Sequence, residues 1–195
     1  MITVIGGLGA IGNRYCKILD MMGLDYNIVD TGTMDAPVGE DIIITTPTPT
    51  HIDYINRFSD SNILCEKPVS LTKEEIEPLL NKANIRMVSN WLFFPGINPN
   101  PQSNLIHYDY FMAGQETDRC NFAQPYYLAD KEKSTFRNKS TIFSLIINGE
   151  QVSLEDVQSS YVEMLGCWLM GDYRQIWSMG DAYTMANVLS QYPED

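Results

Sequence analysis

The hydrophobic positions in the first half of the chain follow two alternating spacings. Short runs of apolar and β-branched residues predict parallel strands that are covered on both faces. Between these runs, apolar residues three or four positions apart predict helices. The predicted strands are 2–5, 26–29, 42–46, 63–65 and 86–88, and the predicted helices are 11–22, 50–58 and a third from Ser70 or Thr72 to about Ala83. Such alternation of strand and helix indicates an α/β domain with a parallel sheet.

The pattern changes after Pro95, where prolines, a glycine and asparagines form a stretch typical of a linker. From residue 105 the apolar and polar positions alternate, which predicts an antiparallel strand. A second run, 141–147, faces 151–154 across Asn148-Gly149, a strong hairpin signal. The tail, 154–189, has a helical pattern with predicted breaks at Gly171 and Gly180. We therefore predict a shortened Rossmann-type domain over 1–95, followed by a small α+β domain with a mainly antiparallel sheet over 96–195.

Charge and cysteine content narrow the class of protein. The 13 basic and 25 acidic residues give a net charge of -12, which argues against a nucleic-acid partner because phosphate binding needs a basic face. The four cysteines are scattered without C-x-x-C spacing, so we expect free thiols and no metal site. No stretch is long and apolar enough to predict a membrane span, and we expect a cytoplasmic protein.

The first candidate site is a glycine pattern between the first predicted strand and helix. Residues 7–12 read Gly-Leu-Gly-Ala-Ile-Gly, and Asp30 ends the next strand about twenty residues on, as the dinucleotide-binding fingerprint requires. We expect Gly7 to allow the tight turn, Gly9 to let the backbone approach a pyrophosphate, and Gly12 to pack the helix on the strand. The helix N-terminus then offers amide groups and a favourable dipole to the phosphates.

Asp30 predicts which dinucleotide is bound. Its carboxylate accepts hydrogen bonds from an adenosine ribose diol and repels a 2′-phosphate, so NAD is favoured over NADP. The alternative is that the glycines only serve a tight turn from strand to helix.

Two further motifs lie at the carboxyl ends of predicted strands, where open α/β sheets bind ligands. Thr45-Thr46-Pro47-Thr48-Pro49-Thr50-His51 follows one strand and Glu66-Lys67-Pro68 follows the next. Together with the glycine pattern, this ordered set resembles the Gfo/Idh/MocA family, which includes glucose–fructose oxidoreductase and inositol dehydrogenase. Residues 64–72 in particular resemble the family's E-K-P segment and the helix behind it, and Asn90, Phe93 and Pro95 resemble the segment after its sixth strand.

The resemblance implies a nicotinamide-dependent oxidoreductase that acts on a sugar, polyol or related compound. It implies that Lys67 lies beside the nicotinamide and the reacting hydroxyl, where an ammonium group assists proton transfer. Separately from the resemblance, the Lys67–Pro68 bond is an X-Pro bond, which can be cis and fix the loop. The predicted cofactor-binding residues are Gly7, Gly9, Ala10, Ile11, Gly12, Asp30, Thr46, Pro47, Thr48, His51, Glu66, Lys67 and Pro68. Alternatively, Lys67 is a surface lysine before a turn proline, and His51 is a residue at a helix start without a chemical role.

The second half departs from the family's pattern. It lacks the D-x-x-x-H pattern that carries the family's acid–base histidine, which leaves His107, on an alternating strand, as a weak catalytic candidate beside Lys67. These departures keep open a second function, that of an inactive dinucleotide-binding sensor or interaction protein. An apolar face on the second sheet would suit a partner subunit, so we expect a homodimer.

Overall fold

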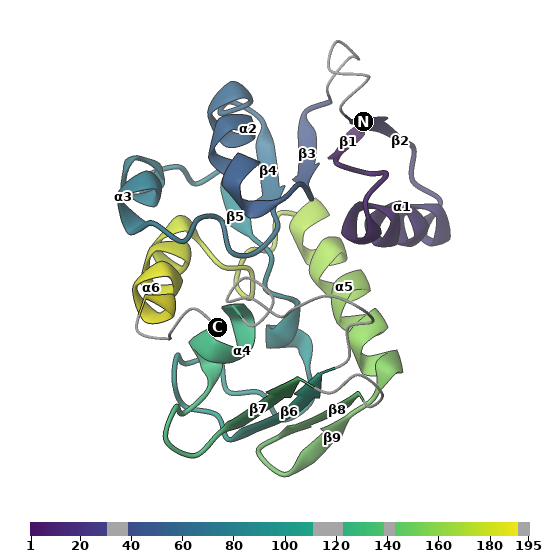
Figure 1. Ribbon diagram of the computed structural model, residues 1–195. Helices are drawn as coiled ribbons and strands as arrows, with labels where there is room; N and C mark the ends of the chain where they lie inside the picture. The colour runs from purple at the N-terminus through teal and green to yellow at the C-terminus, as the bar shows by residue number, and fades with distance from the viewer. Residues whose placement is uncertain (31–38, 111–122, 139–142, 191–195) are drawn as a thin grey trace. The chain divides into compact units, whose positions relative to one another are not determined.

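The computed structural model describes residues 1–30, 39–110, 123–138 and 143–190 (Figure 1). The chain divides into two compact units. The first comprises residues 1–88 together with 177–184, and the second comprises 89–176 together with 185–195. The fold class is the predicted one, a Rossmann-type parallel sheet followed by an α+β part, and each unit is described separately below.

The first unit contains a parallel sheet of five strands within the described residues. The strands are β1 (Ile2–Ile5), β2 (Tyr26–Val29), β3 (Asp41–Ile44), β4 (Asn62–Cys65) and β5 (Ile85–Met87), in the order β2-β1-β3-β4-β5. Every neighbouring pair runs parallel, as predicted. The central strand β3 carries Ile42, Ile43 and Ile44, all fully buried, because helices cover both faces of the sheet.

The helices of the first unit follow the predicted spacing with one exception. Helix α1 (Ala10–Met22) ends at Gly23 in the left-handed conformation, and α2 (His51–Arg57) follows a 3₁₀ turn at Thr48–Thr50. The helix predicted to reach Ala83 is wrong in length, because α3 spans only Lys73–Ile76 and continues as a 3₁₀ turn, Glu77–Leu79. Pro78 has no amide hydrogen to donate, so the α-helical pattern cannot pass through it.

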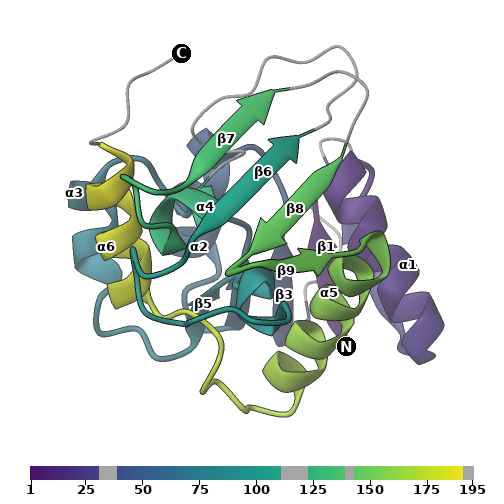
Figure 2. The same ribbon diagram turned by 90° about the horizontal axis from the view of Figure 1, so that it is seen from below.

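The second unit is built on a sheet of four strands in the order β7-β6-β8-β9. The strands are β6 (Ile106–Tyr110), β7 (Thr135–Asn138), β8 (Ser144–Ile147) and β9 (Glu150–Val152), and α4 (Ala123–Leu128) lies between β6 and β7 in the chain. Figure 2 shows β8 running opposite to β6, whereas β7 runs parallel to it. The predicted hairpin is confirmed, with Asn148 and Gly149 both at positive φ.

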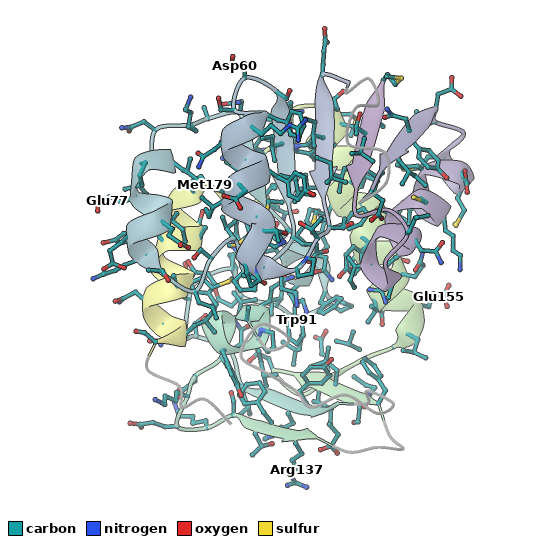
Figure 3. The ribbon with its side chains drawn as sticks, turned by 45° about the horizontal axis from the view of Figure 1, so that its top comes forward. Asp60, Glu77, Trp91, Arg137, Glu155 and Met179 are labelled. Atoms are coloured by element: carbon teal, nitrogen blue, oxygen red, sulfur yellow. The ribbon has the colours of Figure 1, made fainter. Side chains whose placement is uncertain are left out.

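The two faces of this second sheet differ in polarity. The buried apolar face carries Ile106, Leu145, Ile147 and Val152. The opposite face carries His107, Asp109, Thr135, Arg137 and Ile146. Arg137 points away from the sheet there (Figure 3). The expected apolar outer face is therefore wrong for the described residues, because strand alternation turns the apolar side chains toward the helices of the unit. The homodimer stays a prediction without this support.

Two helices complete the described chain, α5 (Leu154–Leu169) and α6 (Met179–Leu189). Gly171, at φ 72°, follows α5 and confirms the predicted break. The break predicted at Gly180 is wrong, since this glycine lies within the first turn of α6. Before α6, the Trp177 carbonyl accepts the Met87 amide at 2.9 Å at the edge of the first sheet. Within the described residues, no helix has the length and apolar character needed to cross a membrane.

Candidate functional site

The carboxyl ends of the strands in the first unit define a binding edge. From β1 the chain passes to β2 on one side, and β3 lies on the other side of β1. Because crossovers between parallel strands are right-handed, α1 and α2 cover opposite faces of the sheet. The loops after β1 and β3 therefore diverge, and this kind of switch point is where open α/β sheets bind ligands.

The glycine loop after β1 turns at Gly6. This residue has φ 81°, a conformation that side chains rarely adopt, and its amide donates to the Val29 carbonyl of β2 at 2.9 Å. The left-handed residue is therefore Gly6, and Gly7 lies within the turn that the Gly9 amide closes on the Gly6 carbonyl at 3.0 Å. A side chain at Gly7 would instead reach 2.8 Å from Ile28, so this glycine is needed for packing against β2.

Gly9 and Gly12 differ in what a side chain would meet. At Gly12 a Cβ atom would lie 2.3 Å from the Gly6 carbonyl oxygen and 2.5 Å from the Gly7 Cα, so only glycine lets α1 pack on the loop. At Gly9, the one neighbour of such an atom within 4 Å among the described residues is the Gly6 carbonyl oxygen, at 3.3 Å. Protein packing therefore accounts for Gly12, whereas the space beside Gly9 stays open for a ligand.

The N-terminus of α1 opens next to this space. The first hydrogen bond of the helix runs from the Asn13 amide to the Gly9 carbonyl at 2.8 Å, so the amides of Ala10, Ile11 and Gly12 precede it. Among the described residues, no side chain caps this end, and the first turn carries no acidic residue. Gly9, Ala10 and Ile11 are exposed. The arrangement suits an anion such as a pyrophosphate.

Asp30 lies beside the glycine loop. Its Oδ2 accepts a hydrogen bond from the Leu8 amide at 3.2 Å, which links the end of β2 to the loop after β1. The fingerprint pattern predicted this proximity between residues 22 positions apart, and the structure brings them together. A carboxylate here offers acceptors to a diol and adds negative charge against a further phosphate.

The segment after β3 carries the predicted residues Thr46, Pro47 and Thr48. Thr45 extends the sheet by donating its amide to the Ile5 carbonyl at 2.9 Å. Thr46 and Thr48 are half-buried and Pro47 is exposed, so the segment borders the binding edge. The Thr50 hydroxyl bonds to the Thr46 hydroxyl at 2.8 Å and holds the turn that begins α2.

Glu66, Lys67 and Pro68 follow β4 at the same edge. The Lys67–Pro68 bond is cis, as the sequence suggested. Lys67 is half-buried, whereas Glu66 is buried and only 6% exposed. The Glu66 carboxylate accepts from the Tyr15 hydroxyl and from the Lys67 amide, each at 3.1 Å. Tyr15 follows the helical spacing of apolar residues in 11–22, and the sequence gave no signal that its hydroxyl bonds to Glu66 after β4.

His51 bridges the two segments after β3 and β4. Its Nδ1 lies 3.0 Å from the Pro68 carbonyl oxygen and its Nε2 lies 2.7 Å from the Thr46 carbonyl oxygen. The ring is buried, with 1% of the residue exposed, and burial lowers the pKa of His51 below the ordinary value of 6.5. His51 thus begins α2 and holds the backbone of two loops together, which is a structural role for a buried ring.

The remaining histidine, His107, lies in the second unit on the outer face of β6. Its Nδ1 is 2.8 Å from the Thr135 hydroxyl of β7. Its neighbour Tyr108 points to the opposite face, where its ring lies 5.6 Å from that of Trp91, labelled in Figure 3. His107 and Lys67 belong to different units of the chain. Among the described residues, no group of histidine, cysteine or acidic side chains has an arrangement that could hold a metal ion.

A hollow of about 240 Å³ lies elsewhere in the second unit, beyond the end of α5. Cys167, Asp172, Arg174 and Gln175 line it. The Arg174 guanidinium donates to both oxygens of Asp172, at 2.8 and 2.6 Å, and these bonds lower the pKa of Asp172 to about 2. Since this guanidinium is already paired, and none of these residues belongs to the predicted site, the hollow gives no support for a second ligand site.

Comparison with known proteins identifies the fold. No protein-family model matches the sequence, and no curated protein matches it either. The fold, however, is that of the Gfo/Idh/MocA-type dehydrogenases.

Three of the similar solved structures show the extent of this likeness. The WlbA dehydrogenase of Thermus thermophilus, in complex with NAD and UDP-GlcNAcA, has a TM-score of 0.65 at 13% identity, over 100% of this chain and 95% of that one. A myo-inositol dehydrogenase of Corynebacterium glutamicum has a TM-score of 0.67 at 13% identity, over 97% and 94%. The UDP-N-acetylglucosamine 3-dehydrogenase GnnA of Acidithiobacillus ferrooxidans has a TM-score of 0.67 at 12% identity, over 97% and 95%.

Proposed function

We propose that the protein is an NAD-dependent oxidoreductase that acts on a sugar, polyol or related hydroxyl or carbonyl compound. The observation that carries the proposal is the open space at Gly9, next to the uncapped α1 N-terminus and with Asp30 beside the loop. The solved structures with this fold are dehydrogenases, and one of them contains NAD, which supports the same choice of cofactor.

The site residues take distinct roles in this proposal. The amides of Ala10, Ile11 and Gly12 bind the pyrophosphate, and Asp30 accepts hydrogen bonds from the adenosine ribose. The segment 46–48 borders the nicotinamide half, and the Lys67 ammonium polarises a substrate carbonyl or stabilises the oxygen that develops charge. The nicotinamide, when bound, supplies or accepts the hydride.

The substrate class rests on two kinds of support. Solved structures with this fold include enzymes named for myo-inositol and for UDP-N-acetylglucosamine, both of which are polyhydroxylated. Lys67, at the binding edge, carries an ammonium group that can stabilise the negative charge developing on a hydroxyl or carbonyl oxygen. We therefore propose a substrate with several neighbouring hydroxyl groups.

The proposal is tested by titrating the protein with NADH and with NADPH, followed by nicotinamide fluorescence. We expect saturable binding of NADH, weaker binding of NADPH, and at least a tenfold loss of NADH affinity in Asp30→Ala, since a bidentate contact to a charged acceptor is worth about 1.5–3 kcal/mol. Asp25→Ala is the matched control, because Asp25 is exposed at the opposite end of β2. Absence of binding to either dinucleotide would reject the proposal.

A second candidate function is that of a dinucleotide sensor without turnover. The observation that favours it is the position of the two histidines that the chain contains: His51 is buried against two carbonyl groups, and His107 lies on the outer face of its sheet. A screen of polyols and sugars with NAD separates the two functions. NADH binding together with a turnover that Lys67→Ala abolishes supports the enzyme, whereas binding without turnover on any polyol supports the sensor.

A further inference from the structure

The carboxylate of Glu66 is buried next to Lys67 and is bonded on both oxygens. Its Oε1 lies 3.1 Å from the Tyr15 hydroxyl, and its Oε2 lies 3.1 Å from the Lys67 amide nitrogen. Burying a carboxylate is costly unless donors surround it, and an apolar side chain would fill this position at lower cost. The acid therefore has a task that packing alone does not explain, and both of its partners indicate what that task is.

The first partner, Tyr15, belongs to α1 and is fully buried. It lies one turn beyond Gly12 on the helix whose N-terminus faces the proposed pyrophosphate site. A phenylalanine would fill the same space in the core, so the hydroxyl is the feature that needs an explanation. Through this hydroxyl, the helix next to the cofactor site is joined to the side chain of Glu66.

The second partner is the backbone of the E-K-P segment itself. Glu66 accepts the Lys67 amide, and His51 contacts the next carbonyl group, that of Pro68, at 3.0 Å. The Lys67 amide is thus held by the side chain of the residue before it, which is bonded to Tyr15 of α1, and the carbonyl group that follows contacts His51 at the start of α2. Burial lowers the pKa of His51, and the negative charge of Glu66 opposes this lowering, so the two groups belong to one cluster.

We propose that Tyr15 and Glu66 are positioning residues, which fix the backbone of Lys67 relative to α1 and so couple the cofactor-binding helix to the lysine that meets the substrate. This inference rests on the proposed function for the role of Lys67. It assigns Glu66 to the protein interior as a link between elements, and it gives Tyr15 a role that the fingerprint does not include.

The test measures hydrogen exchange of the Lys67 backbone amide by NMR on the full chain, with and without NADH. In Tyr15→Phe, Glu66 loses one of its two restraints, and we expect Lys67 exchange to accelerate roughly tenfold, the effect of losing one hydrogen bond to a charged group. Glu66→Gln should also accelerate exchange, because a neutral amide oxygen is a weaker acceptor for the Lys67 amide than a carboxylate oxygen.

Two controls separate positioning from a general loss of stability. Tyr26→Phe removes a hydroxyl that bonds Asp20 of the same helix, also at 3.1 Å, and should leave Lys67 exchange unchanged. The Glu66 amide, which donates to the Ile44 carbonyl at 2.9 Å within the sheet, reports general loosening in the same spectrum. Acceleration at Lys67 alone supports the proposal. Equal acceleration at both amides, or unchanged exchange in Tyr15→Phe, would overturn it.

The arm with NADH keeps the proposal and the proposed function apart. If NADH binds, it should slow Lys67 exchange in the wild type and not in Tyr15→Phe, while the affinity for NADH stays within about twofold. An equal slowing in both proteins would overturn the coupling. If NADH does not bind at all, the proposed function fails, and the comparison without NADH still decides whether Tyr15 and Glu66 hold Lys67.

Discussion

At the scale of single residues, the glycines of the loop differ in whether the fold itself requires them. Alanine at Gly12 would place its Cβ 2.3 Å from a backbone oxygen, so we expect Gly12→Ala to lower the free energy of unfolding by about 3 kcal/mol. Gly9, at φ -73°, has a backbone conformation that alanine adopts, and its Cβ would lie 3.3 Å from the Gly6 carbonyl oxygen, a much milder contact than at Gly12. Gly9→Ala should therefore lose less stability than Gly12→Ala and should lose NADH affinity. Urea unfolding and fluorescence titration of both variants check this. A stable Gly9→Ala protein with full affinity would exclude a close approach of phosphate to this residue.

The buried His51 predicts a pH dependence of stability. Burial lowers its pKa below 6.5 in the folded protein, so the unfolded chain binds the proton more readily. This contribution to stability is fully present above 6.5 and is lost as the pH falls from 6.5 toward the folded pKa. In His51→Gln we therefore expect a weaker decline of the free energy of unfolding between about pH 7.5 and about pH 5, measured with urea. For His107→Gln, on the outer face, the free energy of unfolding should decline with pH as in the wild type. The same decline in His51→Gln would show that His51 does not cause the pH dependence.

The site could be predicted from sequence only as far as local pattern reaches. The fingerprint predicted that Asp30 lies beside residues 7–12, because spacing along one strand–helix–strand unit fixes that distance. It did not show that Gly6 rather than Gly7 adopts the left-handed conformation, since adjacent glycines are equivalent to a pattern. The bond between Tyr15 and Glu66 joins positions 51 apart, and it depends on how α1 lies on the sheet relative to the segment after β4. A tyrosine with helical spacing carries no mark of where its hydroxyl will point.

At the scale of elements, the strands of the first unit follow from their apolar runs, whereas proline and long connections produced the errors. Pro78 shortened α3, and α4, which carries Pro125 in its first turn, was not predicted. The pairing of β6 with β7 is parallel because the chain between them contains α4 and is long enough to cross over. Apolar alternation alone predicts a strand and leaves its direction open.

The capping box at the start of α5 allows an element-scale prediction. The Ser153 hydroxyl accepts the Asp156 amide at 3.0 Å, and the Asp156 carboxylate accepts the Ser153 amide at 2.7 Å. We expect Ser153→Ala to lose about 1 kcal/mol of stability in urea unfolding at neutral pH. The bond from the Ser153 amide lowers the pKa of Asp156 below 3.8 in the folded protein. The contribution of the ionised Asp156 to stability is therefore present above pH 3.8 and is lost as the pH falls through the folded pKa. Ser159→Ala, at an exposed site within the same helix, is the control and should not lower the free energy of unfolding.

At the scale of the whole molecule, the Rossmann-type unit is not continuous in sequence. Residues 177–184 group with residues 1–88, and Trp177 pairs with Met87 at the edge of the parallel sheet. The first half of the chain carries every motif of the predicted cofactor site, yet it does not contain all of the residues that complete its own sheet. The sequence pattern predicted terminal helices without identifying which of their residues serve the first unit, because that pairing joins positions 90 apart in the chain.

Trp177 provides the test of this arrangement. Its side chain is 4% exposed, so Trp177→Ala removes a large buried group and should lower the free energy of unfolding by about 3 kcal/mol or more. Met170→Ala, at a residue 78% exposed between α5 and α6, is the control and should change stability by less than about 0.5 kcal/mol. Urea unfolding followed by far-ultraviolet circular dichroism measures both. Because the loss falls on the unit that carries the glycine loop, NADH affinity in Trp177→Ala should fall at urea concentrations where the wild type still binds. If that variant kept both stability and affinity, the first unit would not depend on the returning segment.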